Sequence, residues 1–171
     1  MISKIKPVKK DKLRVLHSLE QKVLWLSMWM IHNANHLRES IDGLKVGGHQ
    51  ASSASITTIM TALYFSVLRP QDKIAVKPHA SPVFHAIQYM LGRQTQENLE
   101  AFRSLGGTQS YPSRTKDTDG VDFSTGSVGL GVAMTLFASM VQDYTRLNEV
   151  VNEKPARSNE SGRMIAVMGD A

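Results

Sequence analysis

Two short apolar segments, separated by stretches of helical periodicity, constrain the fold of this chain more than any other feature. Residues 73–77 alternate like a short strand, and residues 164–168 form a continuous apolar run that is typical of a buried parallel strand. Strands that alternate with helices favour a mostly parallel sheet whose faces are covered by helices. We therefore predict an α/β fold in which a parallel sheet is flanked by helices.

Five segments carry helical signals. Apolar residues recur at steps of three and four from Leu16 to Leu37, which predicts a long helix that ends near Gly43. The other helices are predicted over about 52–67, with Ser52, Ser53 and Ser55 as N-cap candidates, from Pro82 to Leu91, from Thr95 to a point before Gly106, and from the glycine-rich residues 126–131 to about Leu147. Residues 106–127 are rich in Gly, Ser, Thr and Asp, which predicts a long loop of the kind that often carries function.

Composition excludes several classes of protein. Of the 171 residues, 42% are hydrophobic and 20% are charged, which excludes wholesale disorder. The chain has no cysteine, so disulfides, thiolate metal sites and cysteine nucleophiles are excluded, and a cytoplasmic location is favoured. The densest apolar run, residues 23–31, is too short to cross a bilayer, and the first charged residues are not followed by a secretory signal.

Residues 1–14 form a basic tail ahead of a domain that we predict to span residues 15–171. Six of the first fourteen residues are Lys or Arg, and the charge of the remainder is nearly balanced. Such a tail can neutralise the phosphates of nucleic acid or of anionic lipid, but tails this short are more often solvated, frayed termini. We favour the second interpretation and predict neither a nucleic-acid partner nor a membrane partner.

Residues with reactive side chains follow both predicted strands. His79 comes just after residues 73–77, and Asp170 comes just after residues 164–168. Ligands of parallel sheets gather at the carboxyl ends of strands, where an imidazole can move protons and a carboxylate can hold Mg²⁺ beside a phosphate. His49, which follows two glycines, is a third candidate. The structural alternatives are a turn aspartate that caps a helix and histidines that only satisfy local hydrogen bonds.

Two further patterns have alternative interpretations. The glycines of residues 126–131 could receive a phosphate on backbone N–H groups, or they could simply permit close packing. His32 and His36 lie four residues apart on a predicted helix, a spacing that suits a metal ion. Glu39 is the one further ligand within reach in the sequence, and helix-surface polarity explains all three residues. We therefore interpret His32 and His36 as structural.

Taken in order, five short motifs resemble the thiamine diphosphate-dependent transketolase superfamily. The motifs are Gly47-Gly48-His49 with Ser52, Pro78-His79-Ala80-Ser81-Pro82, Ser110-Tyr111-Pro112, Gly126-Ser127-Val128-Gly129-Leu130-Gly131 and Gly169-Asp170. Within this superfamily the resemblance is closest to the homodimeric decarboxylase component of the bacterial pyruvate dehydrogenase complex. It extends from about residue 20 to the last residue.

The resemblance implies a fold, two cofactors and a set of site residues. Residues 15–171 resemble the front part of the diphosphate-binding domain, and we expect the domain to be cut after the Gly-Asp of its metal motif. The implied cofactors are thiamine diphosphate and Mg²⁺, with Asp170 as the metal ligand. The implied catalytic residues are His49, His79 and Tyr111. The residues implied to line the cofactor are Ser52, His79, Tyr111, Val128, Gly129, Gly169, Asp170 and Ala171.

The implied activity is oxidative decarboxylation of a small 2-keto acid, pyruvate, followed by acyl transfer to a lipoyl-bearing partner, by a cytoplasmic homodimer. Two alternatives stay open: a transketolase that moves two-carbon units between sugar phosphates, and a catalytically empty paralogue or assembly subunit. The chain departs from the family pattern at three places. Ala171 replaces a glycine, Lys77-Pro78 precedes His79 where a glycine is usual, and Ser113 replaces a common histidine.

Overall fold

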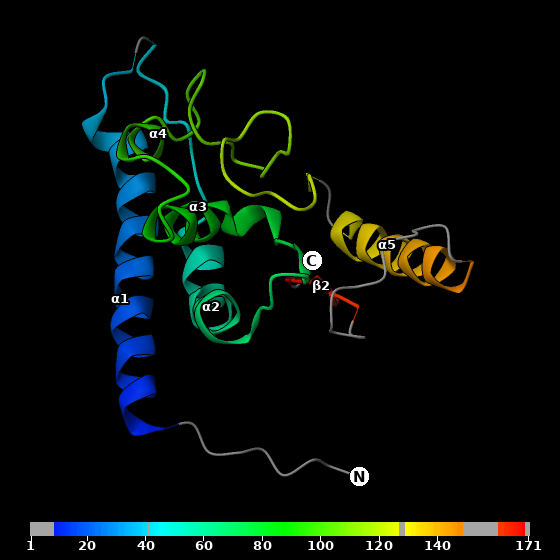
Figure 1. Cartoon of the computed structure of the whole chain (residues 1–171). Helices are drawn as coiled ribbons and strands as arrows, with labels where there is room; N and C mark the ends of the chain where they lie inside the picture. The colour runs from blue at the N-terminus through cyan, green and yellow to red at the C-terminus, as the bar shows by residue number, and fades with distance from the viewer. Residues whose placement is uncertain (1–8, 41, 127–128, 149–160, 170–171) are drawn as a thin grey trace.

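The computed structural model describes residues 9–40, 42–126, 129–148 and 161–169. It shows a mainly helical chain with a small two-stranded parallel sheet (Figure 1). The α-helices are α1 (Lys10–His32), α2 (Gln50–Ala62), α3 (Ser81–Met90), α4 (Gln96–Glu100) and α5 (Leu130–Leu147), and the strands are β1 (Lys73–Ala75) and β2 (Met164–Ala166). Two short π-helices, η1 (Asn33–Leu37) and η2 (Leu63–Val67), extend α1 and α2, and a 3-10 turn, η3 (Pro78–Ala80), precedes α3. None of the helices in these ranges has the length and apolar character that crossing a bilayer requires.

The first helix differs from its prediction at its beginning. It begins at Lys10, so residues 10–14, which we expected to belong to a frayed tail, are helical. Lysine and arginine are good helix formers, and Asp11 in the first turn interacts favourably with the positive end of the helix dipole. These local preferences favour a helix over the frayed terminus that we predicted for residues 10–14. Residues 1–8 of the predicted tail lie outside the described residues.

The predicted serine N-cap of α2 is wrong. His49 occupies the N-cap position without a side-chain hydrogen bond, and α2 begins at Gln50. Ser53 is fully buried within the helix, and its carbonyl accepts a hydrogen bond from the Thr57 hydroxyl at 2.8 Å. Ser53 therefore serves the close packing of α2 rather than its capping, whereas Ser55 is exposed and its hydroxyl donates to the carbonyl of Ser52 at 2.9 Å.

The predictions for α3 and α4 are largely confirmed. Pro82 lies in the first turn of α3, where its missing N–H costs nothing. Thr95 caps α4, because its hydroxyl oxygen accepts a hydrogen bond from the backbone N–H of Asn98 at 3.2 Å. α4 ends at Glu100, earlier than predicted, and turns continue from there to Gly107.

The main apolar core joins α1, α2, β1 and α3. Its most deeply buried members include Val23, Met60, Ile74, Phe84 and Ile87, all between 0 and 4% exposed. A second cluster packs the end of α1 against α4. Together they bury most of the helical stripes that the sequence predicts for the first four helices, but Leu37, Ile59 and Val67 are 61, 54 and 44% exposed, so these three predictions are wrong.

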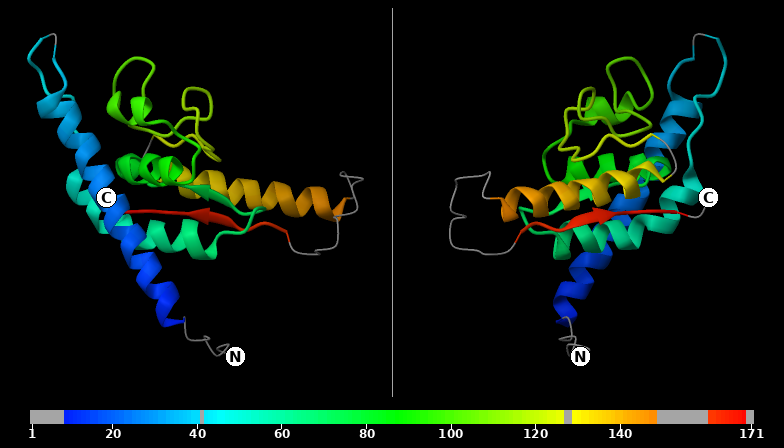
Figure 2. Two further views of the ribbon diagram at one scale, coloured as in Figure 1. Left: turned by 60° about the vertical axis from the view of Figure 1, so that its left-hand side comes forward. Right: turned by 90° about the vertical axis from the view of Figure 1, so that its right-hand side faces the viewer.

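The predicted parallel pairing of the two strands is confirmed. Ile74 lies opposite Ile165, the N–H of Lys73 donates to the carbonyl of Arg163 at 2.9 Å, and the N–H of Val167 donates to the carbonyl of Ala75 at 2.8 Å. Each strand has three residues, fewer than predicted, and β2 is only partly buried. In both views of Figure 2 the strands run between α5 and α2.

Helix α5 leaves most of its apolar side chains uncovered. Thr135 is the one buried residue of this helix, and Gly131 packs against Ala75 of β1. The exposed side chains are Leu136, Phe137, Met140, Val141, Tyr144 and Leu147, each 58 to 76% exposed. α5 is therefore attached to the sheet by a narrow strip of small residues near its N-terminal end.

A buried carboxylate joins the beginnings of the two strands. Asp72 accepts hydrogen bonds from the backbone N–H of Arg163 at 2.8 Å and from the backbone N–H of Arg69 at 2.9 Å. It also pairs with the guanidinium groups of both arginines, at 2.5 Å for Arg163 and 3.2 Å for Arg69. The Arg163 hydrogen bonds are the largest cause that holds the pKa of Asp72 far below its usual range, against the opposing effect of burial. Below, Arg69, Asp72 and Arg163 are called the Asp72 cluster.

We expect Asp72→Asn to lower the free energy of unfolding by about 1.5–3 kcal/mol at pH 7, the range for hydrogen bonds to charged groups. The wild-type carboxylate has a lowered folded pKa, so its contribution is complete well above pH 4 and is lost as the pH falls through the acid range. Urea denaturation at pH 7 and at pH 3 measures both effects. An asparagine variant that matches the wild type at pH 7 would contradict this role.

Candidate functional site

Two histidines from distant segments stack on each other beyond the carboxyl end of β1. The ring centroids of His49 and His79 are 4.2 Å apart, with 22° between the ring planes. His79 lies in η3, which directly follows the strand segment, and His49 is the N-cap residue of α2. The sequence prediction that both belong to one site is thus consistent with their placement. Here His49, His79 and Tyr111 are called the histidine–tyrosine cluster.

The glycines before His49 fix the path of the chain into α2. Gly48 has φ +148°, and a Cβ on it would lie 2.8 Å from Cγ2 of Ile31 on α1. The Asn35 side chain bonds both backbone groups of Gly47, with its oxygen accepting at 2.8 Å and its nitrogen donating at 2.9 Å. The backbone at Gly48 therefore passes so close to α1 that a side chain at this position would push the chain away from Ile31. This close approach brings His49 next to His79.

Tyr111 completes the cluster from the long loop. Its ring centroid is 6.3 Å from that of His79, and the side chain is 43% exposed. A hollow of about 480 Å³ lies beside it, lined in part by Arg103, Ser110 and Tyr111. The loop therefore brings a phenol and a hollow to the two imidazoles.

The electrostatic environment of the cluster is positive. Burial is the first cause that lowers the pKa of His49, and the charges of His79, Arg103 and Lys77 lower it further. Since an ordinary histidine has a pKa near 6.5, His49 is mainly neutral at pH 7 and can accept a proton or a hydrogen bond. The surrounding cations favour an anionic ligand.

Ser52 supplies a polar atom without a partner. Its hydroxyl oxygen is buried and makes no hydrogen bond within the described part of the chain. It lies in the first turn of α2, where backbone N–H groups are free to bind anions. A ligand phosphate at this helix end would satisfy both groups, which agrees with the predicted role of Ser52.

The other predicted cofactor residues are placed less completely. Gly129 is the N-cap residue of α5, and Thr125 near it donates a hydrogen bond to the carbonyl of Val76 at 3.0 Å. Gly169, which follows β2, lies against the Lys77 side chain, so the ends of both strand segments meet at one edge. Val128, Asp170 and Ala171, including the predicted metal ligand, lie outside the described residues.

Sequence reasoning missed a buried polar network behind Tyr111. His85 of α3 is fully buried, with Nδ1 at 2.7 Å from Asp119 Oδ2 and Nε2 at 2.9 Å from the carbonyl of Gln109. Both ring nitrogens thus face oxygen atoms, and the side-chain amide of Gln94 donates a further hydrogen bond to Asp119 at 3.0 Å. His85, Gln94, Gln109 and Asp119, here the His85 network, tie the loop to α3. No sequence motif marks it, since each hydrogen bond of the network joins residues that are 24 or more positions apart.

The structure supports the structural interpretation of His32 and His36. Their rings stack with centroids 5.0 Å apart, and in the described ranges they belong to no group of three potential metal ligands. The one such group found there is His85, Asp117 and Asp119. Asp117 already accepts hydrogen bonds from the backbone N–H groups of Gln109 and Ser113, and we interpret this group as part of the loop anchor.

The structure thus defines a mainly helical protein with a histidine–tyrosine cluster at the end of a parallel strand pair. In comparisons of sequence, no family model matches the chain. The chain is similar to pyruvate dehydrogenase E1 components, with 27% identity over 159 residues to that of Mycolicibacterium smegmatis and 30% over 137 residues to that of Cupriavidus necator. That of Escherichia coli K12 is 32% identical over 117 residues.

These alignments cover 86%, 75% and 63% of this chain but only 16%, 15% and 13% of the relatives. The chain is therefore a distant homologue of pyruvate dehydrogenase E1 components over most of its length, which confirms the predicted resemblance. It spans about one sixth of the length of these relatives.

We expect His85→Leu to destabilise the protein by about 3–5 kcal/mol, because it leaves the Asp119 carboxylate buried without its main partner. The double variant His85→Leu/Asp119→Leu removes both polar groups, so it recovers a substantial part of that loss. Chemical denaturation of the three proteins measures the difference. If the loss of stability in the double variant equalled the sum of the losses in the two single variants, the pairing of His85 with Asp119 would be contradicted.

We expect Lys77→Gln to raise the pKa of His49, because one of the positive charges that disfavour the imidazolium is removed. NMR titration of the imidazole C–H signals measures the shift. Lys116→Gln, which removes an exposed lysine of the loop, is the matched control and leaves the His49 titration unchanged. If the titration midpoint of His49 were unchanged in Lys77→Gln, the charge of Lys77 would have no effect on His49.

Proposed function

We propose that this chain forms the diphosphate-binding part of a thiamine diphosphate- and Mg²⁺-dependent enzyme that acts on 2-keto acids. The observation that carries the proposal is the convergence of His49, His79 and Tyr111, from three separate segments, at the carboxyl end of β1. The homology to pyruvate dehydrogenase E1 components supports the same assignment. The parallel strand pair with helices on both sides is consistent with the front part of a thiamine diphosphate-binding fold.

The described residues fit a diphosphate group. The buried Ser52 hydroxyl lacks a partner, the N-terminal turn of α2 offers free N–H groups, and Lys77 adds a positive charge. Asp170 is the proposed Mg²⁺ ligand, with Val128, Gly129, Gly169 and Ala171 along the cofactor. When bound, thiamine diphosphate supplies a carbon nucleophile and an electron sink for 2-keto substrates.

The chain's own residues then handle protons and charge beside the reacting carbon. Neutral His49 can accept a proton, because its lowered pKa keeps it unprotonated at pH 7. In this proposal its stacking partner His79 and the hydroxyl of Tyr111, whose ring lies 6.3 Å from that of His79, donate hydrogen bonds to oxygens on which negative charge develops. The positive surroundings hold a carboxylate substrate near the three side chains.

Pyruvate is the proposed substrate, because the relatives carry its name, and a lipoyl-bearing acyltransferase is the proposed acceptor of the acyl group. We propose that the active form is a cytoplasmic homodimer. The uncovered apolar face of α5 offers a surface of the kind that a second copy covers. Transketolase-type transfer between sugar phosphates, and a homologue that has lost its activity, are the alternatives that the experiment below separates.

The decisive experiment measures cofactor binding and turnover on the same preparations. For a longer protein that contains this chain together with the rest of the site, we expect calorimetry to show thiamine diphosphate binding in the presence of Mg²⁺, and we expect release of labelled CO₂ from pyruvate labelled at C1. The 171 residues alone hold only part of the proposed site, so we expect them to bind the cofactor poorly or not at all and to be inactive. His79→Ala is expected to lower turnover by about 10²-fold or more with little change in cofactor affinity. Asp170→Asn is expected to weaken Mg²⁺ and cofactor binding together, because it removes a charge from the metal ligand.

His17→Ala, which removes an exposed histidine of α1, is the control and leaves both quantities unchanged. Normal turnover of His79→Ala with a lowered melting temperature would remove His79 from the catalytic residues. Turnover of sugar phosphates alone would favour the transketolase alternative, and failure to bind the cofactor would favour an inactive homologue.

A further inference from the structure

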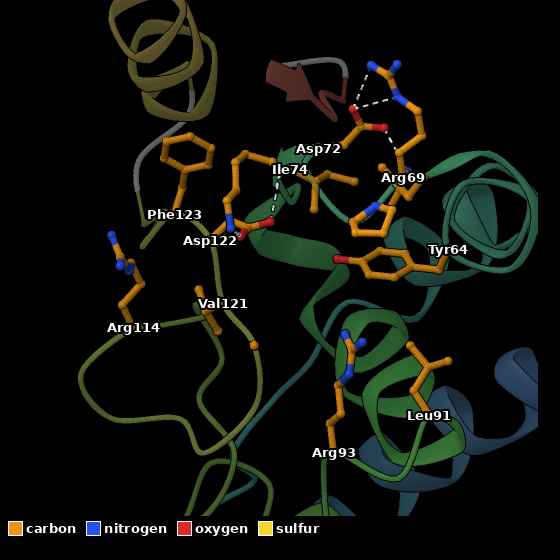
Figure 3. Close-up of a pocket in the computed structure, with 14 residues that line it drawn as sticks. Tyr64, Arg69, Asp72, Ile74, Leu91, Arg93, Arg114, Val121, Asp122 and Phe123 are labelled. Atoms are coloured by element: carbon orange, nitrogen blue, oxygen red, sulfur yellow. Dashed lines mark hydrogen bonds and ion pairs between the residues drawn. The ribbon is translucent and has the colours of Figure 1, made fainter. Parts of the chain in front are cut away.

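A second cavity lies at the opposite end of β1 from the histidine–tyrosine cluster. It has a volume of about 690 Å³ and is formed by the turn before β1, the end of α3 and the loop at 114–123 (Figure 3). Lys73, the first residue of β1, lines it, whereas His79 follows the other end of the strand. Its volume falls in the range of small-molecule sites. It is called the arginine cavity below.

The cavity carries two unpaired positive charges. Arg69 and Lys73 are paired with Asp72 and Asp122, at 3.2 Å and 2.8 Å respectively. Two further arginines line the cavity, and within the described part of the chain neither Arg93 nor Arg114 has a side-chain hydrogen bond or ion pair. Figure 3 shows these guanidinium groups extending from two different walls, Arg93 toward Tyr64 and Arg114 toward Phe123.

A buried hydroxyl without a partner lies in the same wall. The Tyr64 hydroxyl makes no hydrogen bond in the described ranges, and Figure 3 shows it turned toward the interior of the cavity. Burial, and then the charge of Asp122, raise the pKa of Tyr64, so the phenol keeps its proton and remains a hydrogen-bond donor. A buried donor without an acceptor is costly, and an anionic ligand in the cavity would supply one.

The remaining walls are apolar. Leu68, Leu91, Val121 and Phe123 line the cavity, and together with the Tyr64 ring they offer a surface for the organic part of a ligand. Apolar walls with a few convergent polar groups are typical of small-molecule sites.

We propose that the arginine cavity binds an organic phosphate monoester. Its dianionic phosphate lies between Arg93 and Arg114, and its apolar or aromatic part packs against Phe123 and its neighbours. Two free guanidinium groups match the two charges of the phosphate, and arginine can donate two parallel hydrogen bonds to phosphate oxygens. The site is separate from the proposed cofactor site, and the proposal does not depend on the proposed activity.

Phenyl phosphate is the probe, because it combines a phosphate monoester with one aromatic ring. We expect calorimetry on the full chain to show saturable 1:1 binding that weakens with added salt, with inorganic phosphate binding more weakly and phenol not at all. Arg93→Gln and Arg114→Gln each weaken the binding of phenyl phosphate by about tenfold or more, the loss expected for a charged hydrogen bond. Arg146→Gln removes an exposed arginine of α5 as the matched control and leaves the affinity unchanged.

Three results would overturn the proposal: no binding of phenyl phosphate at millimolar concentration, equal affinity for benzoate, or wild-type affinity in Arg93→Gln and Arg114→Gln. Thermal melts of each variant verify folding, and Tyr64→Phe, which removes only a hydroxyl, is an independent variant that is expected to weaken binding. The titration is repeated with saturating thiamine diphosphate and Mg²⁺. If the cofactor displaced phenyl phosphate, the phosphate would bind at the cofactor site, and the proposal of a separate site would be overturned. Unchanged binding of phenyl phosphate supports the proposal even if the enzyme proves inactive.

Discussion

The buried carboxylate of Asp72 holds together two parts of the chain that are 91 residues apart. A parallel pair of three-residue strands forms only one short ladder of hydrogen bonds, and closing so long a loop costs conformational entropy. Asp72 offsets this cost by accepting bonds from both the backbone and the guanidinium group of Arg163 at the start of β2. It also receives the backbone N–H of Arg69, which shapes the turn into β1. The register of the sheet, and with it the meeting of the two strand ends, depends on this one side chain.

The candidate site uses the edge that this register creates. β1 leads to η3 and His79, while β2 leads to Gly169 beside Lys77. The remaining members of the histidine–tyrosine cluster are held from outside the sheet, His49 by the close approach of Gly48 to α1 and Tyr111 by a loop that the His85 network ties to α3. Three separate sets of contacts therefore assemble the site around the two strands: the pairing of β1 with β2, the approach of Gly48 to α1, and the His85 network. We expect loss of any one of them to separate residues that are distant in the sequence.

Much of the strand pair and of the helices packed around it could be predicted from the sequence, because the spacing of apolar residues indicates which face of a helix or strand is buried. The parallel pairing, the Thr95 cap and Pro82 in the first turn of α3 are confirmed. The predicted serine cap of α2 is wrong, because His49 occupies the N-cap position and Ser53 is buried inside the helix. Neither the Asp72 cluster nor the His85 network could be predicted, because their partners meet only after folding and no local pattern links them. The resemblance predicts which residues form the site, and the structure adds the distances between those that it describes.

The geometry of the histidine–tyrosine cluster can be tested without any cofactor. A two-dimensional NOE experiment on the full chain reports imidazole protons that lie within about 5 Å of each other, and the stacked His32 and His36 rings on η1 and α1 provide an internal reference. The structure predicts a strong cross-peak between His49 and His79, whose ring centroids are 4.2 Å apart. A resolved pair of His49 and His79 signals without a cross-peak, beside a clear one for His32 and His36, would contradict the account.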